Sequence, residues 1–193
     1  ALKNDVRTSH IPILLLTAKA DVASKIAGLQ RGADAYLSKP FDRPELLATL
    51  QMMLENRRRL VAHFSEKIHE PRPETAAMVP DFPQKESQLE SEFLERIREL
   101  VAENYQNDTF GLAQLCEMSG MTRFQLSRKM KALTDESPSD FIRAFRLQRA
   151  KKLLTTTRFS VKEVAFQVGF KDVPHFSRAF QESFGVPPSA MRK

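Results

Sequence analysis

The pattern of apolar and polar positions shows a mixed first part of the chain. Residues 11–17 form a short apolar run between polar stretches, which is typical of a buried strand, and residues 35–38 are a second candidate strand. Helical spacing of apolar residues predicts helices over 21–30 and 42–59. This alternation of strand and helix predicts part of a parallel sheet within residues 1–66.

The remainder of the chain has no alternating strand pattern. Residues 67–88 contain four prolines among acidic and polar residues without periodicity, which indicates a linker. Over residues 89–193 the apolar spacing is helical throughout. We therefore expect a mainly α protein, with an all-helical domain preceded by a partial α/β domain at the N-terminus.

An internal repeat organises the helical part. Residues 126–130, Leu-Ser-Arg-Lys-Met, match residues 176–180, Phe-Ser-Arg-Ala-Phe. Each copy contains a short apolar helix, a turn with a glycine and a second, amphipathic helix, which is the layout of a helix-turn-helix. The second helices, which we call the recognition helices, are predicted at about 122–133 and 173–184.

Each recognition helix has an apolar face for the core and an outer face of mixed chemistry. Arginine can pair bidentately with guanine, serine can bond bases or phosphates, and an apolar group can contact the thymine methyl. A single surface arginine is more often merely solvated, but two arginines at equivalent repeat positions favour recognition of DNA. The candidate DNA-contacting residues are Arg123, Phe124, Ser127 and Arg128 in the first unit, and Val173, Pro174, His175, Ser177 and Arg178 in the second.

A helix is predicted between the two units, from Pro138 to Leu154. At 1.5 Å per residue it would span roughly 25 Å. A spacer of that order can hold two recognition helices near one DNA turn apart, about 34 Å. Its cationic residues are interpreted as a solvated face with some phosphate contact: Arg143, Arg146, Arg149, Lys151 and Lys152.

The distribution of charge strengthens this interpretation. Residues 111–193 carry 15 basic and 7 acidic side chains, whereas residues 61–110 carry 5 basic and 11 acidic ones. A basic excess attracts polyanions, although a solvated basic face with no partner is equally common. The charge alone therefore favours nucleic acid only weakly.

Other features predict the compartment and the extent of the chain. The single cysteine, Cys116, excludes an intramolecular disulfide and a cysteine-rich zinc site, so we expect a reducing compartment, the cytoplasm. No apolar stretch approaches the roughly 18 residues that cross a bilayer, so no membrane contact is expected. The start lacks both methionine and a signal pattern, which predicts a chain that opens within a domain.

Other functional classes have less support. No phosphate-binding loop and no histidine pair with metal-ligand spacing occurs, so neither an enzyme nor a cofactor is expected. His63 and His69 are expected to be exposed to solvent, and the apolar setting of Cys116 argues against a nucleophile. The stronger alternative is a protein-interaction module, because Phe124 and Val173 are apolar.

From about residue 89 to the end, the sequence resembles the DNA-binding domain of the AraC/XylS family. The resemblance is carried by residues 164–170 (Val-Ala-Phe-Gln-Val-Gly-Phe), 176–180, and 184–189 (Phe-Gly-Val-Pro-Pro-Ser). It implies two units joined by a long helix, with the recognition helices in successive major-groove segments. Val173-Pro174 departs from the polar residues that relatives often have there.

The first part resembles the last two strand-helix units of a two-component receiver domain, which is a flavodoxin-like fold. The resemblance is carried by residues 14–19 (Leu-Leu-Leu-Thr-Ala-Lys), 32–36 (Gly-Ala-Asp-Ala-Tyr) and 38–41 (Ser-Lys-Pro-Phe).

This resemblance implies roles at a phosphate site. Thr17 would bond an acyl phosphate, Lys39 would pair with that phosphate, and Tyr36 would switch rotamer together with the threonine. In that family the lysine-proline bond is commonly cis. The phosphate-accepting aspartate and the acidic pair for Mg²⁺ belong to earlier strands that this sequence does not contain, so Mg²⁺ is expected only in a complete receiver.

The combination resembles response regulators and the cytoplasmic end of hybrid two-component sensors of Bacteroidetes. It implies a sequence-specific DNA-binding transcription regulator that acts as the output of a phosphorelay. Its implied partners are double-stranded DNA and a histidine kinase in the same or another chain, with RNA polymerase as a further candidate and a dimer expected in the parent. We hypothesise that the helix over 42–59 and the linker transmit the signal by changing dimerisation or by freeing the DNA-binding domain.

Overall fold

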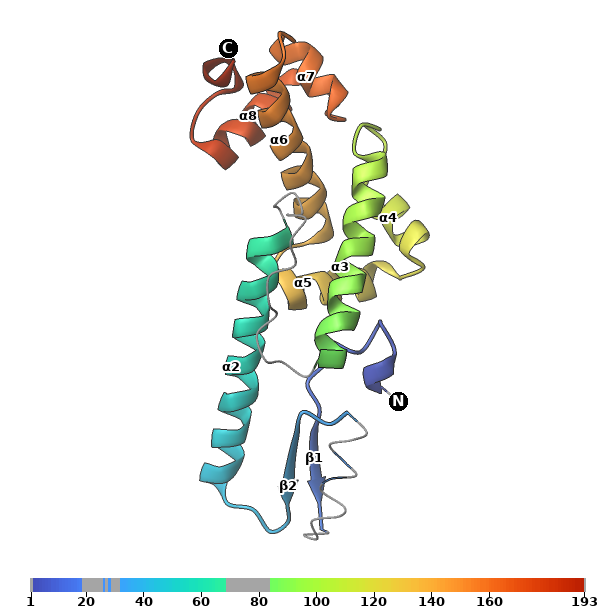
Figure 1. Ribbon diagram of the computed structural model, residues 1–193, viewed down its shortest axis with the longest axis vertical. Helices are drawn as coiled ribbons and strands as arrows, with labels where there is room; N and C mark the ends of the chain where they lie inside the picture. Colours follow the sequence, from blue (N-terminus) through green and yellow to red (C-terminus); the bar gives the residue numbers. More distant parts are fainter. Residues whose placement is uncertain (1, 19–25, 27, 29–31, 69–83, 193) are drawn as a thin grey trace.

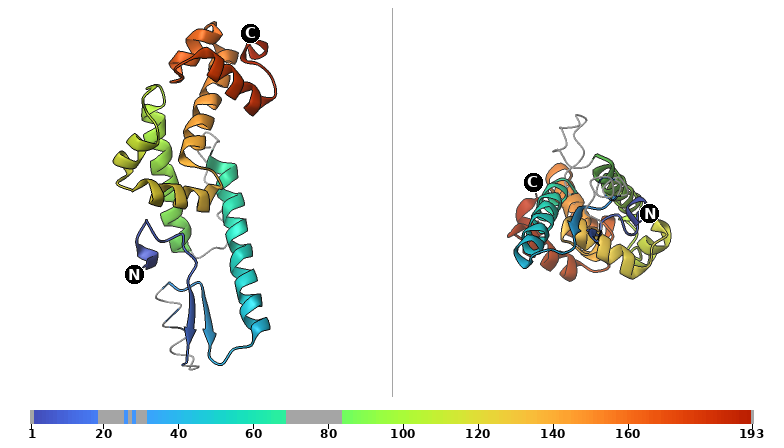
Figure 2. Two further views of the ribbon diagram at one scale, coloured as in Figure 1. Left: turned by 180° about the vertical axis from the view of Figure 1, so that it is seen from behind. Right: turned by 90° about the horizontal axis from the view of Figure 1, so that it is seen from below.

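The computed structural model describes residues 2–18, 26, 28, 32–68 and 84–192. The molecule is elongated, with a two-stranded sheet at one end and the second helix-turn-helix unit at the other (Figure 1). The first unit lies between them, as the reverse view also shows (Figure 2). The helix predicted over 21–30 falls almost entirely outside the described residues.

The two strands form a parallel pair. β1 (Leu14–Thr17) pairs with β2 (Ala35–Ser38) in the register Leu14 to Ala35 through Thr17 to Ser38. The strands are therefore confirmed, with the first one confined to the end of the predicted run. Because parallel strands in this register end at one level, the residues that follow them lie at the same edge of the sheet.

The helix after β2 is longer than predicted. α2 (Arg43–Ile68) begins as expected but continues beyond Arg59, because Leu60 and Phe64 extend its apolar stripe. Phe64 is buried in the core of the first helix-turn-helix unit, and Leu60 packs against that core. The end of α2 thus joins the two parts of the chain, and the predicted linker over 67–88 starts inside this helix.

The first helix-turn-helix unit is built by three helices and the start of a fourth. They are α3 (Gln84–Asn104), α4 (Leu112–Ser119), α5 (Arg123–Thr134) and α6 (Pro138–Thr156). Its core includes the predicted apolar face of α5, namely Leu126, Met130 and Leu133. The N-terminus of α5 is fixed by a capping box, in which the Thr122 hydroxyl accepts from Gln125 N and the Gln125 side chain accepts from Thr122 N.

The second unit uses the rest of α6 with two further helices. α7 (Val161–Gln167) and α8 (Val173–Phe184) pack on α6, followed by the short 3-10 helix η2 (Pro188–Met191). Phe176 and Phe180 are fully buried, and Phe184 packs beside them with its ring centroid 4.6 Å from that of Phe180. These phenylalanines form the apolar core face that the sequence predicts for the second recognition helix, so that prediction is confirmed.

The sequence repeat reappears in the geometry of the two recognition helices. α5 and α8 both have 12 residues. Each ends at a residue in the left-handed region, Asp135 (φ 60°) after α5 and Gly185 (φ 74°) after α8. The turn before each helix contains a left-handed glycine, Gly120 (φ 66°) or Gly169 (φ 80°). Glycine adopts this region without steric cost, so both turns are built on the same left-handed backbone conformation.

Arg146, on the helix α6 that is shared by the two units, binds the loop between α3 and α4. Its Nε donates to Tyr105 O at 2.9 Å, and its Nη2 donates to Asn107 O at 2.7 Å and to Phe110 O at 3.1 Å. The prediction of a solvated cationic face is therefore wrong for Arg146, because this half-buried guanidinium satisfies backbone carbonyls between α3 and α4.

Gly169 is the glycine whose replacement should damage this junction most. A Cβ at this position would lie 2.2 Å from Tyr105 O, in addition to the positive φ. We expect Gly169→Ala to reduce the free energy of unfolding by about 2–5 kcal/mol, from backbone strain and overpacking together. Urea denaturation followed by circular dichroism measures the loss.

Gly120→Ala is the matched control for this substitution. Gly120 has a similar φ of 66°, but a Cβ there would meet nothing within 4 Å. We expect this variant to lose about 1 kcal/mol of the free energy of unfolding, from backbone strain alone. Equal losses in the two variants would contradict the proposed close approach at Gly169.

Candidate nucleic-acid interface

The outer face of α5 carries the predicted contact residues of the first unit. Arg123 and Arg128 are exposed, and Ser127 is half-buried. Phe124 is 72% exposed, which is unusual for an aromatic side chain on an otherwise polar surface. The face therefore offers charge, a hydroxyl and an apolar contact to a partner.

The outer face of α8 is arranged in a similar way. Pro174, His175 and Arg178 are exposed, and Ser177 is half-buried. The His175 ring lies 5.6 Å from the Phe170 ring, which limits its orientation. Val173 is the exception, because it is half-buried and packs against the second core. The predicted outward position of Val173 is thus only partly correct, and Pro174 is the exposed apolar residue.

The two faces present the same pair of polar groups at equivalent repeat positions. Ser127 corresponds to Ser177, and Arg128 corresponds to Arg178. Within the residues that the structure describes, neither guanidinium takes part in an ion pair. Both arginines can therefore bind an external acceptor without breaking an internal contact.

The spacing of the faces is set by α6. This helix has 19 residues, which at 1.5 Å per residue gives about 28 Å. A helix of that length can separate two recognition helices by a distance near one turn of B-DNA, about 34 Å. The assignment of base contacts to the nine candidate residues remains a prediction.

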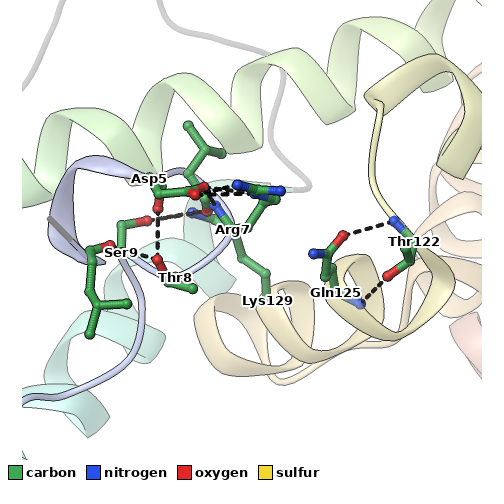
Figure 3. Close-up of polar contacts among 9 residues, drawn as sticks. Asp5, Arg7, Thr8, Ser9, Thr122, Gln125 and Lys129 are labelled. Atoms are coloured by element: carbon green, nitrogen blue, oxygen red, sulfur yellow. Dashed lines mark hydrogen bonds and ion pairs between the residues drawn. The ribbon is translucent and has the colours of Figure 1, made fainter.

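The segment before β1 packs against α5 (Figure 3), and its residues share a depression with Phe124 and Arg128. At its centre is Lys129, which is fully buried and whose Nζ lies 2.6 Å from Glu90 Oε2. The same ammonium donates to Ser9 Oγ at 2.8 Å and to Val6 O. Burial lowers the pKa of Lys129, and the neighbouring Glu90 carboxylate opposes that shift.

Lys129 was not identified from the sequence as a functional residue. The repeat does contain a signal, because Lys129 corresponds to the buried Ala179 of the second unit. A lysine in place of a core alanine indicates that a counter-charge or hydrogen-bond acceptors surround its ammonium group. In this chain the surroundings come from α3 and from the segment before β1.

Of the candidate phosphate-site residues, Thr17 and Lys39 lie at the C-terminal edge of the small sheet, whereas Tyr36 lies within β2 opposite Leu15. Thr17 ends β1, Tyr36 is in β2, and Lys39 follows β2. Lys39 N donates to Thr17 O at 2.7 Å, and the Lys39-Pro40 peptide is cis. The structure thus brings Thr17 and Lys39 together, while their roles toward phosphate remain predictions.

Several other expectations concern sites outside this surface. Burial raises the pKa of the Cys116 thiol, which is the opposite of the activation that a nucleophile needs. The expectation that His63 is exposed is wrong, because its ring packs edge-on against Phe64 at 5.4 Å and the residue is half-buried. His69 lies outside the described residues.

Neither a metal-binding cluster nor a membrane-spanning helix occurs in the described part of the chain. It contains no cluster of three or more histidine, cysteine, aspartate or glutamate side chains suited to a metal ion. None of its described helices combines the length and the apolar character needed to cross a bilayer.

Two family models match the chain. Residues 115–193 match a helix-turn-helix domain, and residues 2–51 match the response regulator receiver domain. The chain therefore combines elements of both families in this order.

Individual relatives agree with this division. Histidine kinase P4 of Formosa agariphila is 36% identical over 97% of this chain, which spans 13% of that protein. The HTH-type transcriptional regulator MtrA of Neisseria gonorrhoeae is 37% identical over 45% of this chain, which corresponds to 29% of MtrA. This chain thus spans less than a third of either relative.

A solved structure supports the helical fold. A transcriptional regulator with an AraC-type DNA-binding domain from Chromobacterium violaceum superposes with a TM-score of 0.50 and is 27% identical. The superposition covers 53% of this chain and 90% of that structure.

Proposed function

Because the chain carries an AraC-type helix-turn-helix domain over residues 115–193 and part of a response regulator receiver domain over residues 2–51, we propose that it is the DNA-binding output of a two-component phosphorelay. In this proposal it recognises duplex DNA sequence-specifically and regulates transcription. Its activity depends on the state of the receiver.

One observation supports this proposal above the others. Two recognition helices of equal length present exposed arginines, Arg128 and Arg178, at equivalent positions beside half-buried serines. A protein-binding surface has no need to repeat its contact residues at this spacing, whereas successive turns of a major groove do.

The candidate residues are proposed to make different kinds of contact with DNA. Arg128 and Arg178 pair with guanine edges, Ser127 and Ser177 bond bases or phosphates, and exposed Phe124 contacts a thymine methyl. Pro174 takes the corresponding apolar role in the second unit, in place of half-buried Val173. Exposed Arg123 and His175, in the first turns of α5 and α8, add polar contacts.

The receiver part is proposed to transmit the signal through α2. This helix begins after β2 and ends in the core of the first helix-turn-helix unit, where Ser65 Oγ donates to Thr134 O at 2.8 Å. A change at Thr17, Tyr36 and Lys39 would therefore reach the DNA-binding domain along one continuous helix. We propose that it changes dimerisation or frees the DNA-binding domain.

The remaining assignments follow from this role. A histidine kinase, in the same or another chain, supplies the phosphoryl group, and RNA polymerase is a candidate partner at the promoter. We propose no catalytic activity for these residues and place the function in the cytoplasm. We expect Mg²⁺ only in a complete receiver, where the resemblance assigns it to an acidic pair on earlier strands.

Fluorescence anisotropy of labelled duplex DNA, measured at several salt concentrations, tests the proposal. A protein that makes six to ten phosphate contacts should lose about 10³–10⁵-fold in affinity between 50 and 200 mM salt. Weak binding that does not respond to salt would contradict DNA binding. It would favour a protein-interaction module that uses exposed Phe124.

A further inference from the structure

A cavity lies where the segment before β1, helix α2 and helix α5 meet. Its volume is about 280 Å³, and its polar lining consists of His10, Arg57, Arg128 and Lys131. No acidic side chain lines it within the described part of the chain. Two of the cations come from the recognition helix α5 and one from α2, so both parts of the chain build the cavity.

The positive charge in this cavity is poorly compensated. Arg57 donates to two backbone carbonyls, His10 O at 3.3 Å and Ala132 O at 3.4 Å, and the described residues place no carboxylate on it. Arg128 has no ion pair among these residues. Lys131 pairs with Asp135 at 2.9 Å, but both side chains are exposed, so this pair exchanges easily with another anion.

His10 provides a second, independent indication of a ligand. Both of its ring nitrogens are buried, and neither has a hydrogen-bond partner among the described residues. Burial, together with the charges of Lys129, Arg57, Arg128 and Lys3, lowers the pKa of His10 to about 4. The imidazole is therefore neutral at pH 7 and offers one N–H donor. Buried polar atoms are normally paired, so this donor needs an acceptor, which it reaches when the His10 ring turns toward the cavity that the residue lines.

We propose that this cavity binds a backbone phosphate of DNA beside the first recognition helix. The inference rests on the proposed function, and it adds a contact from the receiver part of the chain. Phosphate is the ligand that matches an arginine, a lysine and a neutral N–H donor in a lining that holds no acidic side chain. Arg128 lies at the boundary between the base-reading face and this site, which places the cavity at the edge of the groove.

The packing of α2 against α5 couples this phosphate site to the receiver part of the chain. Arg57 reaches the site only while α2 is packed against α5. A phosphate bound to Arg57 and Lys131 together therefore stabilises the packed arrangement, and the packed arrangement in turn strengthens DNA binding. The receiver part acts as an additional DNA contact as well as a controlling element.

Arg57→Gln in the full chain tests this site directly. By anisotropy on a duplex selected for binding, we expect about a five- to tenfold higher Kd at low salt, because one charged phosphate contact is lost. The slope of log K against log salt should become shallower by about 0.9. Arg57→Lys should restore most of that slope, which a merely structural role in donating to carbonyls would not predict.

Arg58→Gln is the matched control. It removes the same charge from the same helix, but Arg58 is exposed and does not line the cavity. Its Kd should change less than twofold, and its salt slope should remain close to that of the unchanged chain. Equal effects of Arg57→Gln and Arg58→Gln would overturn the proposal.

His10→Leu supplies a second readout that leaves the net charge at pH 7 unchanged. We expect about a threefold higher Kd with an unchanged salt slope, because a neutral donor to phosphate is lost. Nuclear magnetic resonance of the His10 ring should show a shift at stoichiometric DNA. A shift with inorganic phosphate alone, and none with DNA, would identify a free-anion site and overturn the DNA assignment.

The outcomes separate this inference from the proposed function. If Arg178→Ala weakens DNA binding while Arg57→Gln and His10→Leu leave both Kd and slope unchanged, the inference fails and the proposed function stands. If the unchanged chain binds no DNA, the proposed function fails, and the inference fails with it.

Discussion

Glu90→Gln is expected to lower the free energy of unfolding by about 3–5 kcal/mol. Glu90 and Lys129 are 3% and 0% exposed, and their charged atoms lie 2.6 Å apart. The substitution leaves the Lys129 ammonium buried without its counter-charge, surrounded by neutral acceptors such as Ser9 Oγ, Val6 O and the new amide oxygen. Chemical denaturation monitored by circular dichroism measures the effect.

Two further variants make this prediction specific. Glu99→Gln removes a carboxylate from the same helix, but its pair with Arg96 is exposed, so we expect a change below about 0.5 kcal/mol. The double variant Glu90→Gln with Lys129→Met removes both charges and should recover most of the lost stability. A double variant as unstable as Glu90→Gln would show that the unpaired charge is not the cause.

Arg128→Ala and Arg178→Ala are expected to have the largest effects on DNA binding. Each removes an exposed guanidinium that can pair bidentately with guanine, so each should cost about 1–3 kcal/mol of binding free energy. Because they lie in separate units, the two losses should add. Anisotropy titration against duplexes altered in one half-site measures the affinities and assigns each arginine to its half.

Arg96→Ala is the control for these two substitutions. Arg96 lies on α3, is 59% exposed, and forms an ion pair with Glu99. We expect no more than a small change in affinity and no change in sequence preference. Losses of affinity in Arg128→Ala and Arg178→Ala that are no larger than in Arg96→Ala would mean that general charge, not base recognition, holds the DNA.

The repeated features of the fold could be predicted from the sequence. The phenylalanine face of α8, the apolar face of α5 and the glycine turns at Gly120 and Gly169 follow from spacing and residue type. These features depend on residues close in the sequence, where helical periodicity and backbone preference determine the structure.

The features that could not be predicted depend on contacts between distant segments. Lys129 is buried by Glu90 and by the segment before β1, more than a hundred residues earlier in the chain. In the sequence, Arg146 cannot be distinguished from a surface arginine. Its role depends on the backbone carbonyls between α3 and α4, which only the fold brings close to it. Val173 turns partly toward the core because of how α8 packs, which its position in the repeat does not reveal.

The candidate site also contains features that could be predicted from local sequence and features that could not. The outer faces of α5 and α8 were predictable because each lies opposite a buried apolar face. The cavity with His10 and Arg57 was not, since it forms only where α2 and the segment before β1 meet α5. The cavity forms because α2 is long enough to pack against α5. The continuation of α2 beyond Arg59 depends on packing of Phe64 in the helix-turn-helix core.

Selection of binding sites from a randomised pool of duplex DNA by the full chain tests the central claim most directly. We predict enrichment of two short half-sites about 10 base pairs apart, one for each recognition helix. Arg128→Ala should relax the sequence preference in one half-site and Arg178→Ala in the other. A pool that yields no motif, or a single half-site unaffected by either substitution, would contradict recognition by two repeated helices.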